Sequence, residues 1–114
     1  MDPIIIVEGK NDKKLLQFVL ANDVQIICTY GTFGIEKFDE MLETYWLDDR
    51  EVFIFVDTDR SGVTLRKELT AQLPHAKHLY VSKDTGEVEA ATPEEIAAII
   101  APYFTVKKMF KYRK

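Results

Sequence analysis

The chain has a single cysteine, Cys28, among its 114 residues. One cysteine excludes a disulfide framework and a zinc site built from cysteine thiolates. No apolar run approaches the ~18 residues that a membrane-spanning helix needs, and the apolar segment Pro3–Val7 is too short for a signal peptide. Hydrophobic residues still make up 46% of the chain, a normal share for a globular protein, which excludes general disorder. These features predict one compact cytoplasmic domain with no membrane segment.

Acidic residues are missing from the last ten positions of the chain. Residues 1–104 hold all 19 acidic residues and only 10 basic ones, so their net charge is −9, against −4 for the whole chain. We therefore divide the sequence into a domain, residues 1–104, and a basic C-terminal tail, residues 105–114. The basic residues of the tail are Lys107, Lys108, Lys111, Arg113 and Lys114. Aromatic residues alternate with them, which suits a nucleic-acid partner because cations contact phosphates and rings stack on unpaired bases. A frayed, solubilising terminus or an edge strand is the alternative interpretation.

Two kinds of apolar pattern alternate along residues 1–104. Short runs rich in β-branched and aromatic residues predict four strands, at Pro3–Val7, Val24–Cys28, Val52–Val56 and Lys77–Val81. Segments with helical spacing separate the strands and follow the last one. This alternation predicts a three-layer α/β/α domain, Rossmann-like, with a central parallel sheet of about four strands and right-handed crossovers.

Four helices are expected between and after these strands. The first covers Asn11–Ala21, and the last begins at Thr92, where the run Thr92-Pro93-Glu94-Glu95 has the pattern of a capping box with proline at the first helical position. The apolar stripes of the other helices and of the last one are expected to be buried. Their members are Ile35, Phe38, Leu42, Tyr45 and Trp46 in the second, Leu65, Leu69 and Leu73 in the third, and Ile96, Ile99, Ile100 and Tyr103 in the fourth.

Carboxylates follow two of the predicted strands. Glu8 comes directly after the first strand, and Asp57 and Asp59 come after the third. Ligands of open parallel sheets bind at the carboxyl ends of the strands, so these side chains converge if the two strands are neighbours. Two such charges about 5 Å apart repel by roughly 3 kcal/mol at an effective dielectric constant near 20, and a bound cation relieves that repulsion. Oxygen ligands without nearby histidine or cysteine favour Mg²⁺ or Mn²⁺, which point to phosphoryl transfer or hydrolysis.

A simpler interpretation exists for one of these acids, because Asp59 also stands where the helix that contains Leu65 needs an N-cap.

The two motifs together, IIIVEGKND and, further along, FVDTDRSG, resemble the toprim domain of topoisomerases, bacterial primases and several nucleases. The resemblance extends from residue 3 to about residue 100. It implies that Glu8 is the general acid or base and that Glu8, Asp57 and Asp59 surround a bound Mg²⁺.

The same resemblance suggests roles for several residues next to the carboxylates. Gly9 and Gly62 would let the backbone approach the metal or a phosphate closely, and Gly31 stands where family members often have a glycine. Apart from the resemblance, the positions and charges of Lys10 and Arg60 offer them as contacts for substrate phosphates; exposed solvated side chains are the alternative for both.

The toprim half of the ribosomal-RNA maturation ribonuclease is the nearest resemblance, through VEGKND and the later run EVEAATPE. That class typically has Glu-His-Ala where this chain has Glu89-Ala90-Ala91, so any role of the histidine is absent. Glu89 would add a fourth carboxylate or be a solvated loop acid. Small free-standing toprim proteins have a similar length.

The leading hypothesis is therefore a Mg²⁺-dependent nuclease-like domain that acts on RNA or DNA. A topoisomerase needs a tyrosine nucleophile on another domain, and a primase needs zinc-binding and nucleotide-holding regions, for which 114 residues leave no room. The alternatives are a non-catalytic nucleic-acid or protein interaction module with the same fold, and an aspartyl phosphatase or receiver domain that uses Asp57. A protein partner or a homo-oligomer also stays open.

Overall fold

Four strands and four α-helices alternate in the computed structural model, which describes residues 1–31 and 35–111. The elements are β1 (Ile4–Val7), α1 (Lys10–Val19), β2 (Gln25–Cys28), α2 (Ile35–Tyr45), β3 (Val52–Phe55), α3 (Arg60–Gln72), β4 (Lys77–Leu79) and α4 (Pro93–Ile100), with short 3-10 turns at Leu47–Asp49, Val88–Ala90 and Lys108–Phe110. The strands form one sheet in the order β2-β1-β3-β4, and each neighbouring pair is parallel. The predicted α/β fold with a four-stranded parallel sheet is confirmed.

The sheet is covered on both faces, so its two central strands are apolar at every position. Residues of β1 and β3 alternate between the faces: Ile5 and Phe53 belong to one hydrophobic cluster, and Ile4 and Ile54 belong to the other. All four side chains are buried. This two-sided burial is the reason why these strands lack the polar alternation of a half-exposed sheet.

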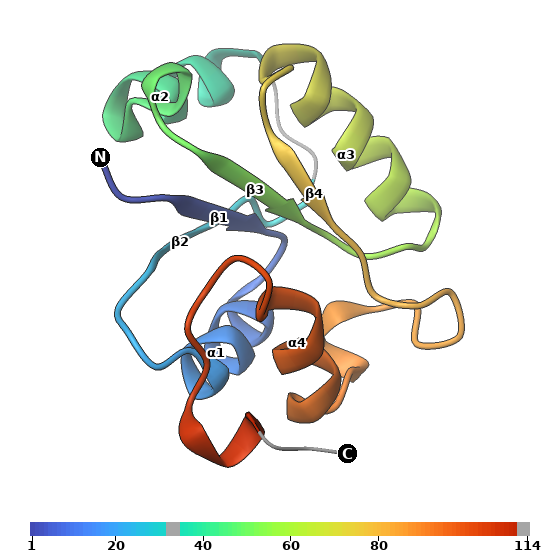
Figure 1. Cartoon of the computed structure of the whole chain (residues 1–114). Coiled ribbons are helices and arrows are strands. Elements are labelled where there is room, and N and C mark those ends of the chain that lie inside the picture. Colours follow the sequence, from blue (N-terminus) through green and yellow to red (C-terminus); the bar gives the residue numbers. More distant parts are fainter. Residues whose placement is uncertain (32–34, 112–114) are drawn as a thin grey trace.

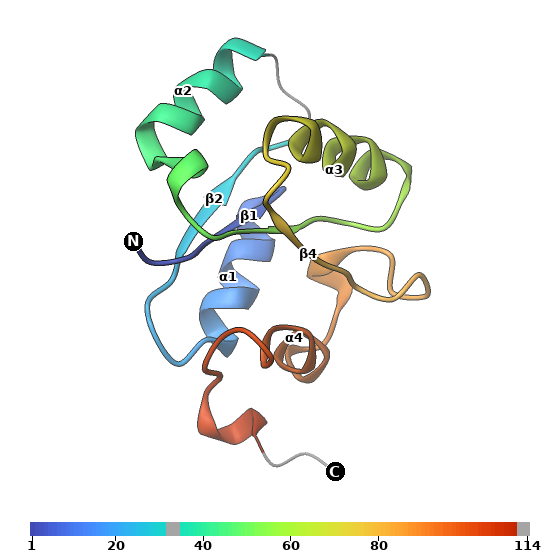
Figure 2. The same ribbon diagram turned by 45° about the horizontal axis from the view of Figure 1, so that its top comes forward.

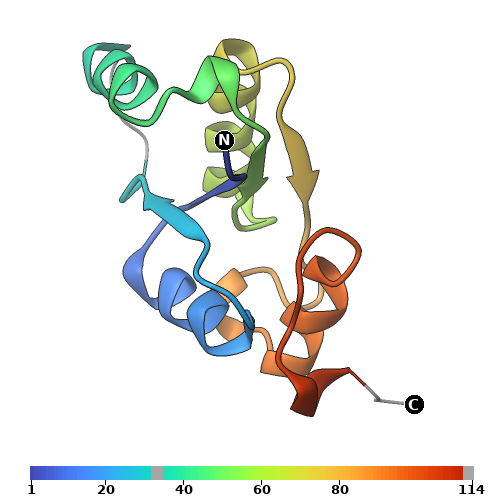
Figure 3. The ribbon, with the colours of Figure 1, turned by 60° about the vertical axis from the view of Figure 1, so that its left-hand side comes forward.

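The helices form the two outer layers (Figures 1 and 2). α1 and α4 contribute Leu16 and Ile96 to the cluster on one face, and α2 and α3 contribute Phe38 and Leu65 to the cluster on the other. Figure 3 shows the same arrangement from the side, with the sheet between the two helical layers. Because β1 and β3 are neighbours in the centre, the residues that follow them meet at one edge.

Two expected core residues are exposed instead. Trp46 follows the end of α2, has a left-handed backbone conformation and is 58% exposed. Tyr103 follows the end of α4 and is 49% exposed. In both cases the helix ends earlier than the apolar pattern suggests, so the last aromatic residue of the stripe leaves the buried face. Met41 of α2 is buried, although the pattern did not place it on the apolar stripe of that helix.

The N-terminus of α4 has half of the predicted capping box. The hydroxyl of Thr92 accepts a hydrogen bond from the Glu95 N–H at 3.1 Å, as an N-cap does. The Glu95 carboxylate does not return to the cap; it accepts hydrogen bonds from the Thr85 hydroxyl. Through Glu95, the first turn of α4 is therefore hydrogen-bonded to the loop that precedes the helix.

The described part of the basic tail packs against the end of α1. The Ala21 N–H donates to the Thr105 carbonyl, the Lys107 N–H donates to the Val19 carbonyl, and Val106 is buried between these two bonds. Lys108 and Lys111 are exposed, and Arg113 lies outside the described residues. Within the described residues, no helix combines the length and the apolar character that a membrane crossing requires.

Candidate metal centre

Glu8 and Asp57 follow the two central strands, and the structure brings them into direct contact. Oε1 of Glu8 accepts a hydrogen bond from the backbone N–H of Asp57 at 3.1 Å, across 49 residues of sequence. Both side chains are half-buried. The sequence predicted this convergence on the condition that the first and third strands are neighbours, and the strand order meets that condition.

Asp59 lies beside this pair and also caps α3. Its Oδ1 accepts hydrogen bonds from the Gly62 N–H at 2.8 Å and from the Ser61 hydroxyl at 3.2 Å. The capping interpretation is therefore correct, and the charge of Asp59 still reaches both other acids, since it raises the pKa of Glu8 and of Asp57. An open hollow of about 530 Å³ lies next to Asp59 and is lined also by Arg60, Ser61 and Thr64.

The loop before α4 holds Asp57 in place, which the sequence did not indicate. Oδ1 of Asp57 accepts a hydrogen bond from the Val88 N–H at 2.8 Å. The backbone N–H of Thr58 donates to the Gly86 carbonyl at 2.8 Å, so the loop is tied to the end of β3 at two points. The loop contributes only backbone groups to these two contacts, the Val88 N–H and the Gly86 carbonyl, so its residue types do not predict them.

Two further acids share the electrostatic field of the site. Asp12 in the first turn of α1 is only 6% exposed, and its Oδ2 accepts a hydrogen bond from the Gly9 N–H at 3.0 Å. Glu89 is exposed and accepts a hydrogen bond from the Asn11 side chain at 2.9 Å. The charge of Glu89 raises the pKa of both Asp57 and Asp12. The structure thus brings Glu89 near the cluster as an outer acid.

Burial and mutual repulsion make the ionised cluster costly. Burial is the main cause that raises the pKa of Glu8, and the charges of Asp57, Asp59 and Asp12 raise it further. Burial likewise raises the pKa of Asp57, although the hydrogen bond from Val88 acts in the opposite direction. The pKa of Asp12 is raised to about 6, chiefly by burial. Such a cluster gains from a proton or from a cation placed among its members.

The donor set fits Mg²⁺ or Mn²⁺ in its chemistry. The carboxylates of Glu8, Asp57 and Asp59 are hard oxygen donors, and each has an oxygen that accepts no backbone hydrogen bond from the described residues. Among residues 1–31 and 35–111, no three histidine, cysteine or acidic side chains stand close enough together to enclose an ion. Mg²⁺ does not need such a cage, because it keeps several waters and is usually bound through one or two carboxylates and substrate phosphates.

The remaining predicted site residues lie at the same edge of the sheet. Lys10 is exposed in the first turn of α1, and Arg60 is exposed in the first turn of α3. Gly31 follows β2 with a φ of +94°, a conformation that favours glycine, and the N–H of the preceding Tyr30 donates to the Glu8 carbonyl. Gly9 has open space around it, since a Cβ there would come no closer than 3.9 Å to Asp12.

Asp12 gives the metal-free protein a pH-dependent stability. A carboxyl whose folded pKa is about 6 instead of 3.8 binds its proton more tightly in the folded state, so the free energy of unfolding falls as pH rises between these values. We expect Asp12→Asn, which keeps an acceptor for the Gly9 N–H, to flatten this decline and to raise stability at neutral pH by about 1–2 kcal/mol. Urea unfolding with a chelator across this pH range measures the effect.

Asp39→Asn is the control for this prediction, because Asp39 is exposed on α2. It should leave the dependence of the unfolding free energy on pH unchanged. An Asp12→Asn protein with the same dependence on pH as the wild type would contradict the prediction.

Comparison with known proteins identifies relatives of this chain. The sequence profile of the Toprim domain matches residues 3–91. The chain is 38% identical over 88% of its length to the uncharacterized protein YusF of Bacillus subtilis (strain 168), and 33% identical over 90% of its length to ribonuclease M5 1 of Ligilactobacillus salivarius (strain UCC118). A solved small TOPRIM domain protein from Bacillus stearothermophilus has a TM-score of 0.88 and 31% identity, with 100% of this chain and 96% of that chain covered.

The curated relatives are longer than the region they share with this chain. The matched region spans 67% of YusF and 58% of the ribonuclease. The solved structure, in contrast, matches over nearly its whole length. The shared region is therefore the domain that carries the carboxylates.

Proposed function

Because this chain belongs to the toprim domain family, we propose that it is a Mg²⁺- or Mn²⁺-dependent domain that hydrolyses phosphodiester bonds of nucleic acid. The observation that carries the proposal is the contact between Glu8 and Asp57 at the carboxyl edge of the sheet, with Asp59 beside them. One relative is named as a ribonuclease, which favours RNA as the substrate. Family membership also argues against the aspartyl phosphatase and receiver alternatives.

Glu8 is the proposed general acid or base. Its hydrogen bond from the Asp57 N–H fixes the carboxylate at one oxygen, and its raised pKa brings proton uptake and release nearer to neutral pH. Asp57 is held by the Val88 N–H, and Asp59 by the Gly62 N–H, so these two carboxylates are oriented before any ligand arrives. Preorganised charges of this kind favour a reaction at a fixed position.

Asp57, Asp59 and Glu8 are the proposed ligands of the metal ion, one or two of them directly and the others through its waters. When bound, a divalent cation polarises a phosphoryl oxygen and lowers the pKa of a water molecule. Lys10 and Arg60, exposed on either side of the carboxylates in the first turns of α1 and α3, would contact the flanking phosphates. The hollow beside Asp59 and Arg60 leaves room for the substrate backbone.

Cleavage of end-labelled RNA and DNA tests the proposal. We expect the wild-type protein to cleave at least one of these substrates with Mg²⁺ or Mn²⁺ and to lose cleavage when a chelator removes the ion. Glu8→Gln should lower the rate at a given ion concentration, while Glu36→Gln, a change on the exposed face of α2, should not. Binding of nucleic acid without metal-dependent cleavage of any substrate would instead support the non-catalytic interaction module.

A further inference from the structure

The exposed face of α1 is basic, although residues 1–104 as a whole are acidic. Lys10, Lys14 and Phe18 are exposed and stand four residues apart, so they form one stripe along the helix. The only acid in α1 is Asp12, which is buried and bonded to the Gly9 N–H. No exposed acidic side chain of the helix therefore opposes the lysines of the stripe.

The fold joins this stripe to the C-terminal segment. The Lys107 ammonium lies 5.1 Å from the centre of the Phe18 ring, and the Phe110 ring meets the same ring edge-on at 5.9 Å. Lys108, Met109 and Lys111 are exposed on the same segment. The stripe and the segment are therefore contiguous at Phe18. We call their exposed and basic residues together the basic track: Lys10, Lys14, Phe18, Lys107, Lys108, Met109 and Lys111.

The basic track begins at the candidate metal centre. Lys10 follows Glu8 by two residues, whereas the C-terminal segment hydrogen-bonds to Val19 at the other end of α1. The 10 residues of α1 rise by about 15 Å, so the track leads from the carboxylates to the other end of α1, where the C-terminal segment packs. Figure 3 shows the C-terminal segment on the same side of the sheet as α1.

We propose that the basic track binds a single strand of nucleic acid and leads it toward Glu8. The inference rests on the proposed function and adds the route of the substrate. Lysines spaced along one surface contact successive phosphates. Phe18 and Met109, 49% and 62% exposed beside these lysines, offer apolar surface to bases, which only unpaired bases can reach.

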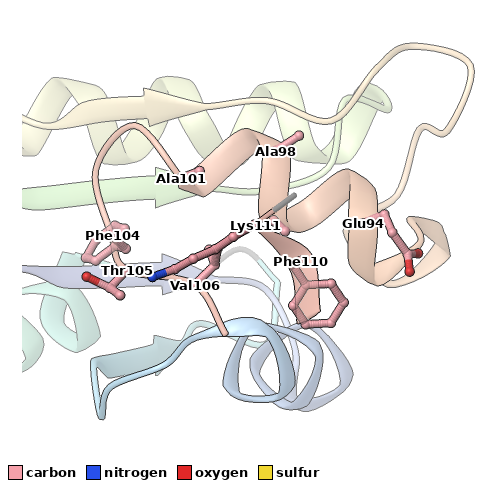
Figure 4. Close-up of a pocket in the computed structure, with 9 residues that line it drawn as sticks. Glu94, Ala98, Ala101, Phe104, Thr105, Val106, Phe110 and Lys111 are labelled. Carbon is pink, nitrogen blue, oxygen red and sulfur yellow. The ribbon is translucent and has the colours of Figure 1, made fainter. Parts of the chain in front are cut away.

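A groove of about 600 Å³ lies next to the track, between α4 and the C-terminal segment (Figure 4). It is lined mainly by alanines of α4 and by Phe104, Val106 and Phe110, with Glu94 and Lys111 as its charged members. Apolar side chains give phosphates no hydrogen bond or opposite charge, and the Glu94 carboxylate repels them. The lysines of the track, and not this groove, are therefore the proposed contacts.

Fluorescence anisotropy with labelled oligonucleotides tests the track. Single-stranded RNA, single-stranded DNA of the same sequence and the matching duplex are titrated in the presence of a chelator, so that binding is measured without cleavage. We expect Lys14→Glu, and separately the double variant Lys108→Glu with Lys111→Glu, to weaken single-strand binding by about fivefold or more. The slope of log K against log salt should fall by about 0.7 for each phosphate that the variant protein no longer binds.

Lys67→Glu is the matched control, because Lys67 is exposed on α3 in the other helical layer. It should leave affinity within about twofold of the wild type. Lys14→Glu affinity equal to that of Lys67→Glu, or a duplex bound as tightly as the single strand, would overturn the proposal. If cleavage depends on Glu8 but Lys14→Glu does not change binding, the basic track is refuted and the proposed function is not. Track-dependent binding without cleavage of any substrate would support the track and refute the proposed function.

Discussion

Replacing Gly62 with alanine is expected to destabilise the protein by about 3–5 kcal/mol. Gly62 is buried in the first turn of α3, and a Cβ at this position would stand 2.1 Å from the Asp57 carbonyl oxygen and 2.6 Å from its carbonyl carbon. Both atoms belong to the backbone at the end of a central strand, so neither can move without moving the sheet or the helix. A loss of this size is a large share of the roughly 5–15 kcal/mol that stabilises a typical domain.

The clash also acts on the candidate metal centre. Relief of the clash must move the first turn of α3 relative to the Asp57 backbone, and this is the turn that Asp59 caps through the Gly62 N–H. The sequence suggested that Gly62 lets the backbone approach a metal or a phosphate. In the structure, the group that lies closest to Gly62 is the backbone of Asp57.

Urea unfolding with a chelator measures this prediction, with Gly9→Ala as the control. A Cβ on Gly9 would have only an ordinary contact with Asp12 at 3.9 Å, and its backbone is extended, so we expect a change in the free energy of unfolding below about 1 kcal/mol. A Gly62→Ala protein as stable as Gly9→Ala would contradict the geometry of the β3–α3 junction.

Replacing Asp57 with asparagine is expected to lower the cleavage rate by at least about 100-fold and to stabilise the metal-free protein. The substitution removes one of the charges proposed to hold the ion, and a loss of several kcal/mol in the transition state corresponds to a fall of this size. It keeps a side-chain oxygen that can accept the Val88 N–H. It also removes repulsion with Asp59 and Glu89, whose charges raise the pKa of Asp57.

The opposite directions of the two effects make this prediction specific. A residue that only supports the fold would lose stability and activity together when it is replaced. Single-turnover cleavage and urea unfolding with a chelator measure the two quantities on the same protein. Asp84→Asn is the control, because Asp84 is exposed in the loop between β4 and α4. Full activity of Asp57→Asn would contradict the proposed role of this carboxylate.

The sequence by itself determined the fold and the main pair of the site. Two central strands without a polar position require cover on both faces, and helical segments between strands require parallel crossovers. Parallel strands end at the same edge, so the acids that follow β1 and β3 had to meet once these strands were neighbours. The roles of Glu8, Asp57 and Asp59 as metal ligands stay predictions; the structure shows the hydrogen bond from the Asp57 N–H to Glu8, and the charge of Asp59 raises the pKa of both.

Only the tertiary structure decided what surrounds that pair. In the sequence, Asp12 is one acid in the first turn of a predicted helix, and nothing marks it as buried. Packing buries it and raises its pKa to about 6. The Val88 N–H that binds the Asp57 carboxylate and the Asp57 backbone that lies against Gly62 are backbone groups, which are alike in every residue type. The charge of the tail is visible in its residues, but the place of residues 105–111 is not, because it depends on Val106 pairing with Leu20 at the end of α1. Local patterns fix periodicity and chain order, whereas burial and long-range backbone contacts exist only once the layers have packed.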